Sequence, residues 1–341
     1  MDPQWSISSW CGGPAARYRR CSKPLSRCFE KDCASTASAP RTVRVNWQLR
    51  GFRNRSRLRG AARSRHGSSL CRVSEFGPLA VPNGSRLASQ SGSDIWNVPA
   101  GWTLYFEPAT GSTNDDAKAA ATQGVPHRTV FLADVQTAGR GRNGRSWVAP
   151  AGSSLLFSLV LRVDLPIPDL AALPAVSAAD WLREATGLDV QVKWPNDLMV
   201  GSRKLGGILT ETITEARPAP VVVGIGINVN VDLSAGWLPP TATSLMAEMG
   251  RPFDRPSLLL GILRGIDGYL GAPPDSRSAS LVARWNELLW RRNQVVKLAL
   301  TGEELEGIVE GLSSAGSLLL RTADGGLREL ATGELWIDAL P

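Results

Sequence analysis

Cysteine is absent from most of this 341-residue chain. All five cysteines lie near the start, at Cys11, Cys21, Cys28, Cys33 and Cys71. A body without cysteine excludes a secreted fold held together by disulfides and is typical of a reducing compartment, so we expect a cytoplasmic protein. No two cysteines form a Cys-x-x-Cys pair, so the sequence also lacks the usual ligand spacing of a structural zinc site.

Long apolar runs are missing too, because nowhere are 18 consecutive residues apolar, and this argues against a membrane-spanning helix. Acidic residues are scarce in residues 1–84, which hold 16 Lys and Arg against 4 Asp and Glu, a charge of +12. The whole chain holds 38 and 31, so the remainder holds 22 and 27, a charge of −5. The overall charge of +7, which taken alone would suggest nucleic-acid binding, therefore belongs to the N-terminal segment.

The N-terminal segment also lacks a sustained apolar period of 2 or 3.6 residues. We therefore predict that residues 1–95 form a basic, disordered extension rather than a folded domain. Three interpretations of this extension stay open: a segment dispensable for function, an organellar transit peptide, or a basic arm that contacts nucleic acid.

From about residue 96 the sequence has the texture of a globular domain. Apolar and β-branched runs predict strands over residues 102–106 and 129–135 and a mostly buried strand over 154–163. Ser112 or Thr113 is a natural N-cap for a helix that continues through the following alanines, although a helix N-terminus is also suited to a polar ligand. Apolar residues near helical spacing predict a second helix over residues 169–186, on one face of a sheet.

The last third of the sequence predicts helices and then short strands. Apolar faces predict helices over residues 256–270 and 280–292. Glycine-containing turns then separate strand candidates over residues 295–300, 305–312, 318–322, 326–330 and 334–337. A small β-barrel is the expected closure of such strands, so we predict a catalytic domain over residues 96–292 and a C-terminal domain over 293–341.

An arginine-glycine loop follows the strand predicted over residues 129–135. Its sequence, from Gln136 to Trp147, is Gln-Thr-Ala-Gly-Arg-Gly-Arg-Asn-Gly-Arg-Ser-Trp. Glycine allows a close approach to a ligand, and each guanidinium offers donors suited to carboxylate or phosphate. We interpret the loop as an anion-binding segment, mobile when empty and ordered by its ligand; a solvated basic turn is the alternative.

A second polar cluster lies between residues 190 and 211. The pattern predicts two strands joined by a turn around Gly201 and Ser202. Lys193, Asn196, Asp197 and Lys204 are the polar candidates in it, although Asn196 and Asp197 could be plain turn residues. Lys204 differs from an ordinary surface lysine because Gly206 and Gly207 follow it and leave room for a ligand.

Alternating glycines mark a third segment, residues 221–230, as a central strand with a close neighbour. Gly224 and Gly226 resemble part of a dinucleotide-binding fingerprint. A third glycine and a following helix are both missing, however, which excludes that interpretation.

Taken together, five blocks resemble those of biotin protein ligases and occur in that family's order. The blocks are Ser112-Thr113-Asn114, residues 136–147, Lys193-Trp194-Pro195-Asn196-Asp197, Arg203-Lys204-Leu205-Gly206-Gly207-Ile208 and Gly224-Ile225-Gly226-Ile227-Asn228. The resemblance covers roughly residues 100–341. It implies an α+β fold: a mixed or antiparallel sheet with helices, like class II aminoacyl-tRNA synthetases, followed by an SH3-like C-terminal β-barrel.

The resemblance implies a ligase with biotin and ATP as substrates and Mg2+ as cofactor. Such an enzyme makes biotinyl-5′-AMP and then transfers biotin to one lysine of the biotin carboxyl carrier domain of a carboxylase. A carboxylate that attacks the α-phosphate brings negative charges together, so cationic side chains and a metal are needed at such a site. Because nothing before residue 96 resembles the winged helix-turn-helix of the family's repressors, we do not expect DNA binding. We expect a monomer or a homodimer, with no membrane partner.

The resemblance also implies the residue roles. Ser112, Thr113 and Gln136 would bind the biotin head group, Arg140 and Arg142 would wrap the carboxylate and adenylate, and Arg145 would lie nearer the phosphates. Lys204 would stabilise charge in both half-reactions, and Asp197 would contact the metal or the acceptor lysine. The expected catalytic residues are Lys204, Arg140, Arg142 and Asp197. The expected binding residues are Ser112, Thr113, Asn114, Gln136, Gly139, Arg140, Gly141, Arg142, Arg145, Trp147, Lys193, Asn196, Lys204, Gly206, Gly207, Gly224, Gly226 and Asn228.

Two alternative functions stay open beside the ligase. A lipoate or octanoyl transferase shares this type of fold, although its expected motifs are absent and the arginine-rich loop with Lys-Trp-Pro-Asn-Asp favours biotin. A biotin-sensing regulator without enzymatic activity would instead make use of the basic N-terminal segment.

Overall fold

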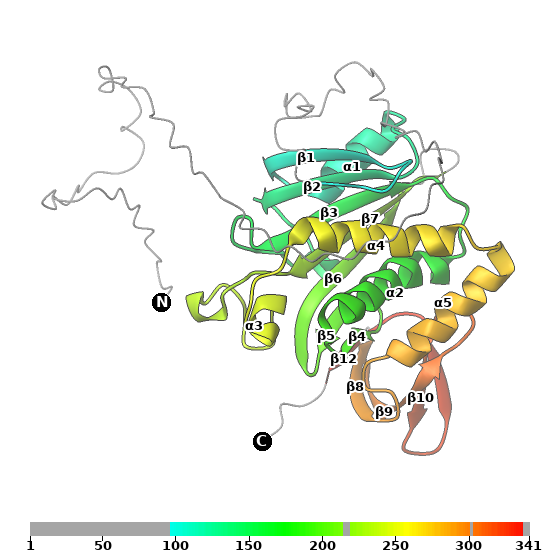
Figure 1. Ribbon diagram of the computed structural model, residues 1–341. Helices are drawn as coiled ribbons and strands as arrows, with labels where there is room; N and C mark the ends of the chain where they lie inside the picture. The colour runs from blue at the N-terminus through cyan, green and yellow to red at the C-terminus, as the bar shows by residue number, and fades with distance from the viewer. Residues whose placement is uncertain (1–95, 214–218, 301–302, 337–341) are drawn as a thin grey trace, which may run out of the picture. The chain divides into compact units, whose positions relative to one another are not determined.

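A computed structural model describes residues 96–213, 219–300 and 303–336 of the chain (Figure 1). The predicted disordered extension, residues 1–95, lies outside the described residues, and so do all five cysteines.

Seven strands form one mixed sheet in the order β1-β2-β3-β7-β6-β5-β4. β1 and β2 are parallel, and every other neighbouring pair is antiparallel. The strands are β1 (Thr103–Thr110), β2 (Thr129–Gln136), β3 (Ser154–Leu161), β4 (Val190–Lys193), β5 (Asp197–Val200), β6 (Arg203–Thr212) and β7 (Val221–Asn228). The predicted α+β class with a mixed sheet is therefore confirmed.

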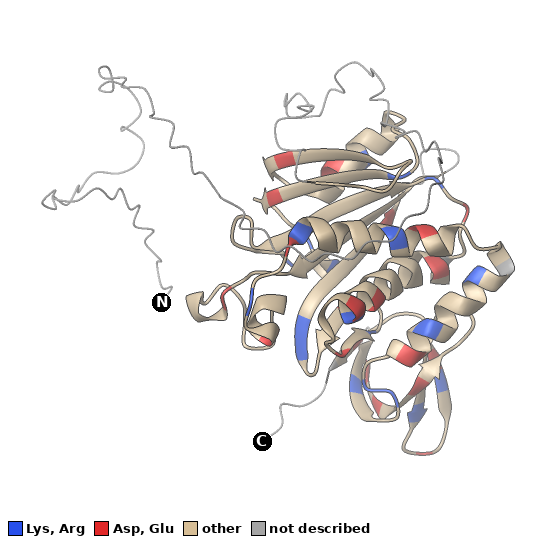
Figure 2. Ribbon diagram, in the orientation of Figure 1, with Lys and Arg blue, Asp and Glu red and all other residues tan. Residues whose placement is uncertain are grey.

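Helices cover both faces of this sheet. On one face α2 (Ile167–Thr186) packs between α4 (Arg255–Leu270) and α5 (Pro274–Leu288), and on the other α1 (Thr113–Thr122) lies across β2, β3 and β7 (Figure 1). All eight residues of β3 are buried, because α4 covers one side of this strand and α1 the other. Its unbroken apolar sequence thus has a physical reason. Lys and Arg are interspersed with Asp and Glu along α2, α4 and α5 (Figure 2).

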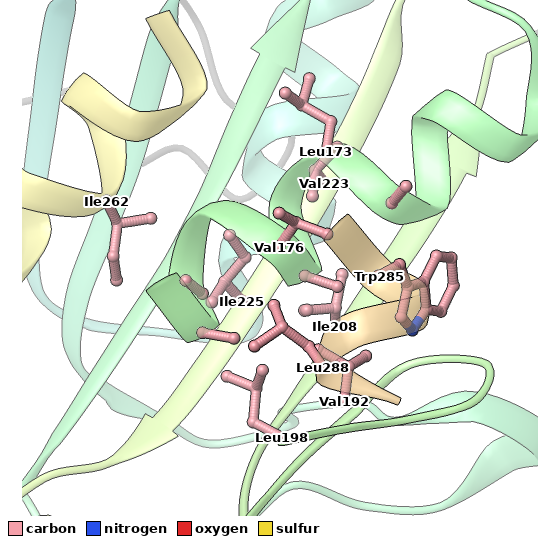
Figure 3. Close-up of a cluster of buried hydrophobic side chains, with 14 of the residues drawn as sticks. Leu173, Val176, Val192, Leu198, Ile208, Val223, Ile225, Ile262, Trp285 and Leu288 are labelled. Carbon is pink, nitrogen blue, oxygen red and sulfur yellow. The ribbon is translucent and has the colours of Figure 1, made fainter. Parts of the chain in front are cut away.

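Two hydrophobic cores separate on the two faces. The larger lies between the sheet and α2, α4 and α5, and includes Val176, Ile225 and Trp285 (Figure 3). It continues into the C-terminal sheet through Leu298 and Leu320. The smaller core holds the alanines of α1 against Phe131, Val160 and Val222. The sheet is therefore held from both sides, which fixes the strand ends that carry the polar residues.

The segment between residues 190 and 212 differs from the prediction. Two strands were expected, but three are present, because residues 194–196 form a turn between β4 and β5. Asn196 closes it by donating its backbone N–H to the Lys193 carbonyl at 3.0 Å. Pro195 has no N–H to donate to a ladder, so the chain leaves the first strand there. The turn expected at Gly201 and Ser202 is present between β5 and β6.

Helix boundaries differ at smaller scale. The last long helix, α5, begins at Pro274 and ends at Leu288, several residues earlier at each end than predicted. A short helix, α3 (Leu245–Met249), was not predicted; Ser244 caps it by accepting a hydrogen bond from the Ala247 N–H at 3.1 Å. None of the helices in residues 96–213, 219–300 and 303–336 has the length and hydropathy needed to cross a membrane.

Five antiparallel strands form the C-terminal sheet in the order β11-β10-β9-β8-β12. They are β8 (Val295–Leu300), β9 (Glu303–Leu312), β10 (Leu318–Thr322), β11 (Leu327–Leu330) and β12 (Glu334–Trp336). The prediction of short strands here is confirmed. The C-terminal part of the chain meets the part that holds the seven-stranded sheet at one tryptophan and one helix: the Trp194 indole donates to the Gly316 carbonyl at 3.2 Å, and Asn286 of α5 accepts from the Leu312 N–H at 2.8 Å.

Candidate functional site

A pocket opens where six segments far apart in sequence converge. These are the start of α1, the end of β2 with its arginine-glycine loop, the turn between β4 and β5, and the central strands β3, β6 and β7. Gly333 and Glu334, from the C-terminal part of the chain, also line it. The strand order explains the convergence, because β7 lies between β3 and β6 in the middle of the sheet.

The pocket collects most of the residues that the sequence predicted. Those that line it are Ser112, Thr113, Asn114, Gln136, Arg140, Gly141, Arg142, Arg145, Trp147, Lys193, Asn196, Asp197, Lys204, Gly207, Gly224 and Gly226.

Three predicted binding residues lie outside the pocket lining. A Cβ on Gly139 would be 2.5 Å from the Trp147 carbonyl oxygen, and one on Gly206 would be 2.8 Å from the Gly226 carbonyl oxygen. Asn228 is buried and donates from Nδ2 to the Thr243 carbonyl at 3.0 Å. These residues shape the loop and the sheet, and their predicted role in binding stays a prediction.

The sequence did not single out several other lining residues. Phe157, Ile208 and Ile225 form apolar parts of the pocket wall. The sequence did not identify them as site residues, because apolar residues in a strand are expected to belong to the hydrophobic core. Glu334 adds a carboxylate from a strand that nothing in the sequence connects to the site. Ser158, directly behind the lining, bonds to two of the predicted residues.

Each of the three loop arginines is held by a different element. Arg140 donates from Nη2 to Asp115 Oδ1 at 2.6 Å, Arg142 from Nη1 to Asn196 Oδ1 at 3.0 Å, and Arg145 from Nη2 to Glu334 Oε2 at 2.6 Å. Their mutual repulsion is thus offset locally by protein acceptors. An anionic ligand in the pocket would have to compete with these acceptors. That the loop is mobile when empty stays a prediction.

Lys204 and Asp197 form an ion pair in the pocket. Lys204 Nζ lies 2.7 Å from Asp197 Oδ1 and 5.8 Å from the centre of the Trp147 ring. The backbone of Lys204 is held on its other side, since its N–H donates to the Thr241 carbonyl at 2.8 Å and its carbonyl accepts from Thr243. The ammonium is therefore positioned by a carboxylate, an aromatic face and a fixed strand.

Lys193 is a partly buried cation of the pocket. Its Nζ lies 5.5 Å from the centre of the Trp290 ring. Burial lowers the pKa of Lys193, while the carboxylates of Asp197 and Glu334 oppose that shift. A phosphate group near this lysine would favour its charged form, as a site that binds a polyanion requires.

Gly224 and Gly226 give room to protein side chains. A Cβ on Gly224 would be 2.1 Å from Asn114 Oδ1, and one on Gly226 would be 2.7 Å from the Trp147 ring. Asn114 and Trp147 thus lie directly against the two glycines. Trp147 also covers Gly207, whose Cβ would be 3.3 Å from the ring.

The start of α1 presents polar groups to the pocket. Ser112 is the N-cap residue, as predicted, but its side chain accepts no capping hydrogen bond. Instead the Thr113 N–H donates to Gln136 Oε1 at 2.8 Å. Gln136 therefore replaces the usual cap, and the Ser112 hydroxyl is not used for capping.

No group of three or more His, Cys, Asp or Glu side chains in the described ranges could hold a metal ion. Asp197 is a single carboxylate and is bound to Lys204. A protein-only metal site is therefore not formed by these residues. One carboxylate together with phosphate oxygens is, however, a common way to bind magnesium.

Comparisons with known proteins identify relatives of both parts of the chain. The model of the biotin/lipoate A/B protein ligase family matches residues 108–228, and that of the biotin protein ligase C-terminal domain matches residues 293–335. The biotin--[acetyl-CoA-carboxylase] ligase of Paracoccus denitrificans is 35% identical over 237 residues, which are 63% of this chain and 93% of the relative.

A further relative is the bifunctional ligase/repressor BirA of Bacillus spizizenii, 38% identical over 169 residues, which are 48% of this chain and 52% of the relative. The chain thus spans about half the length of that protein. Among solved structures, the biotin protein ligase of Aquifex aeolicus in complex with biotin and ATP superimposes with a TM-score of 0.60 at 29% identity, covering 69% of this chain and 97% of that one.

Proposed function

The chain belongs to the biotin protein ligase family, and from this premise we propose that it joins biotin to ATP and then transfers biotin to a lysine of a carrier protein. The observation that carries the proposal is the composition of the pocket at the start of α1 and the arginine-glycine loop. Arg142, Arg145, Lys193 and Lys204 line it together with the polar start of α1 and the apolar walls of Phe157 and Trp147. A substrate with an apolar body, a polar head and an anionic reacting end matches these groups.

In the first proposed half-reaction, a biotin carboxylate oxygen attacks the α-phosphorus of ATP. A new P–O bond forms, the bond to the bridging oxygen of the β-phosphate breaks, and pyrophosphate leaves with the electron pair. The approach brings anions together, so cations that already face the pocket lower the barrier. Lys204 and Arg142 are the proposed cations nearest the reacting atoms, with Lys193 and Arg145 at the leaving phosphates.

In the second proposed half-reaction, the neutral amine of the acceptor lysine attacks the acyl carbon of biotinyl-5′-AMP. The amide bond forms, AMP leaves with the electrons of the C–O bond, and the amine loses a proton. Until the acceptor arrives, water must be kept from the mixed anhydride. We assign that task to the arginine-glycine loop with Trp147, which already covers Gly207 and Gly226.

Magnesium belongs to the proposal as a partner of ATP. Asp197 lines the pocket beside Lys204 and would supply one carboxylate oxygen, with the phosphates supplying others. When bound, the ion would offset phosphate charge. Arg140 would exchange Asp115 for the substrate carboxylate or the adenylate, because its guanidinium lies at the pocket lining.

The finer fold and the partner are part of the same proposal. We propose that the seven-stranded sheet with its helices is the class II synthetase-like catalytic domain, and that the five C-terminal strands close as an SH3-like barrel. The antiparallel order of those strands and the match to the family's C-terminal domain support this assignment. The acceptor is proposed to be a biotin carboxyl carrier domain, because the Paracoccus relative is named for acetyl-CoA carboxylase.

A direct assay tests the function. The purified full chain is incubated with ATP, Mg2+ and labelled biotin, with and without a biotin carboxyl carrier domain. We expect pyrophosphate release with biotin alone and covalent label on the carrier when it is added. Labelled lipoate with a lipoyl domain is the matched control. Labelling with lipoate but not biotin would identify a lipoate ligase, and biotin binding without pyrophosphate release would identify a sensor.

A further inference from the structure

A buried serine lies behind the polar start of α1. Ser158 is in the middle of β3 and its side chain is fully buried. Its Oγ lies 2.6 Å from Asn114 Oδ1 and 2.7 Å from Thr113 Oγ1. A hydroxyl placed in an otherwise apolar strand, with two partners at the pocket wall, is costly to bury unless both bonds are made.

The bonds around Asn114 fix the orientation of its amide. Glu211 Oε2 lies 2.8 Å from one end, and because a carboxylate only accepts, that end is Nδ2. Oδ1 therefore faces Ser158 and accepts its proton. Both ends of the amide are thus occupied by the protein, and Gly224 leaves the space in which it lies. Asn114, predicted as a binding residue, is thus held in place by Ser158 and Glu211 at the wall of the pocket.

The same logic extends to Gln136. Since the Ser158 proton goes to Asn114, the single proton of the Thr113 hydroxyl is shared between two acceptors, Ser158 Oγ at 2.7 Å and Gln136 Oε1 at 3.1 Å. The Thr113 backbone N–H then holds Gln136 Oε1, so Nε2 is the end left for a ligand. Gln136 lines the pocket, and its Nε2 presents donors suited to a carbonyl oxygen.

From this chain of contacts we propose that Ser158 is a positioning residue for the head group of the substrate. This proposal rests on the proposed function in one respect, namely that the head group is the ureido ring of biotin. Ser158 holds Asn114 and Thr113, and through them the start of α1 and the amide of Gln136, in the one arrangement that offers donors to an uncharged carbonyl. It does not touch the ligand.

A matched control lies on the same strand. Ser154 is also fully buried on β3, four residues away and on the same face, and within the described part of the chain its Oγ has no hydrogen-bond partner. Ser154→Ala and Ser158→Ala therefore remove the same atom from the same kind of environment. Only the second variant breaks a bond that reaches the pocket.

The experiment measures the affinity of the full-length chain for biotin by calorimetry. We expect Ser158→Ala to weaken biotin binding about tenfold, as the loss of one buried hydrogen bond would. ATP binding should change less than about twofold. Ser154→Ala should bind both ligands like the wild type. Because Ser158 acts in part through Asn114 and in part through Thr113, the effects of Ser158→Ala and Asn114→Ala on biotin binding should be less than multiplicative when the two are combined.

Contrary outcomes are distinguishable. Unchanged biotin affinity in Ser158→Ala, with or without a lower melting temperature, would overturn the positioning role and leave the ligase function intact. Independent, multiplicative effects of the two substitutions would overturn the route through Asn114. If the wild type bound biotin but formed no biotinyl-5′-AMP, the proposed ligase function would be overturned. The positioning role of Ser158 would then still be tested by the biotin affinity of Ser158→Ala. Absence of biotin binding by the wild type would overturn both.

Discussion

Lys204 combines several contacts in a single residue. Its ammonium is 2.7 Å from Asp197 and faces the Trp147 ring, and Lys204 lines the pocket together with four other cationic residues. The strand that carries Lys204 is held on both sides. Its next residues pair with Gly226 and Ile227 of β7, and the backbone N–H of Lys204 donates to the Thr241 carbonyl. A charge fixed in this way costs little reorganisation when the reaction develops negative charge near it.

We therefore predict that Lys204→Ala lowers the rate of biotinyl-5′-AMP formation by about 10²-fold or more, the usual effect of removing one positioned transition-state donor. Pyrophosphate release is the measurement, and circular dichroism checks the fold. Arg203→Ala is the matched control, because Arg203 precedes Lys204 on β6 but pairs with Glu248 outside the pocket. Near-normal pyrophosphate release by Lys204→Ala would remove Lys204 from the catalytic set.

At the scale of single residues, the sequence predicted the chemical type of the site residues better than their contacts. Charged residues close to glycines in the sequence, such as Arg142 and Lys204, are recognisable from residue type and spacing alone. The role of Asn114 was not, since an amide exposed to a ligand and an amide held by Ser158 and Glu211 look identical in the sequence. Ser158 itself gave no signal, because one hydroxyl in an apolar strand is ordinary.

Strand β7 shows what glycine does at the scale of an element. Gly224 and Gly226 alternate with Val223, Ile225 and Ile227, which belong to the main core. The larger side chains thus point to one face, and the glycines leave the other face open for Asn114 and Trp147. Because side chains alternate between the two faces of a strand, one strand can contribute to the core on one face and leave space for the pocket residues on the other.

Gly226→Ala is predicted to displace Trp147, because its Cβ would stand 2.7 Å from the indole ring. We expect a change in tryptophan fluorescence and a KM for biotin raised about tenfold or more, the result of moving a wall of the pocket by a few tenths of an ångström. Gly268→Ala is the control, since its Cβ would meet nothing within 4 Å on helix α4. Unchanged KM and fluorescence in Gly226→Ala would show that Trp147 is not fixed by this strand.

Strands were predictable where a long apolar pattern determines the secondary structure. They were not predictable where a turn divides the chain into short strands. The buried run of β3 and the glycine-rich run of β7 were found as strands because their apolar residues leave little alternative. The three-strand arrangement around Pro195 was missed, since four-residue strands such as β4 and β5 are too short to show a period. This matters for the site, as Asp197 opens the second of those strands.

For the whole molecule, the notable feature is that the C-terminal sheet takes part in the pocket. Glu334, at the start of β12, reaches Arg145 of the loop between β2 and β3. The two residues are 189 positions apart in sequence. No local pattern predicts such a contact, because it depends on how the hydrophobic core continues from the helices into the C-terminal strands. The sequence predicted the small sheet but not its contribution to the site.

Charge holds this contact over a wide range of pH. The hydrogen bond from Arg145 lowers the pKa of Glu334 below its ordinary value of 4.5. A carboxyl whose pKa is lowered in the folded state contributes its stability above its ordinary pKa, and that contribution disappears as the pH falls through the lowered value. The contact should therefore be complete at neutral pH and break only in acid, below about pH 4.5.

We predict that Glu334→Gln raises the KM for ATP about threefold to tenfold at neutral pH, because Arg145, 63% exposed, must then be ordered by the phosphates themselves. Arg145→Ala should raise it similarly, and the double variant no further. The free energy of unfolding should change by less than about 1 kcal/mol, as for an exposed pair. Glu303→Gln is the control, since Glu303 pairs with Arg328 on the same sheet outside the pocket. A KM for ATP that stays at the wild-type value in Glu334→Gln, or falls below it, would mean that Glu334 does not hold Arg145 for the nucleotide.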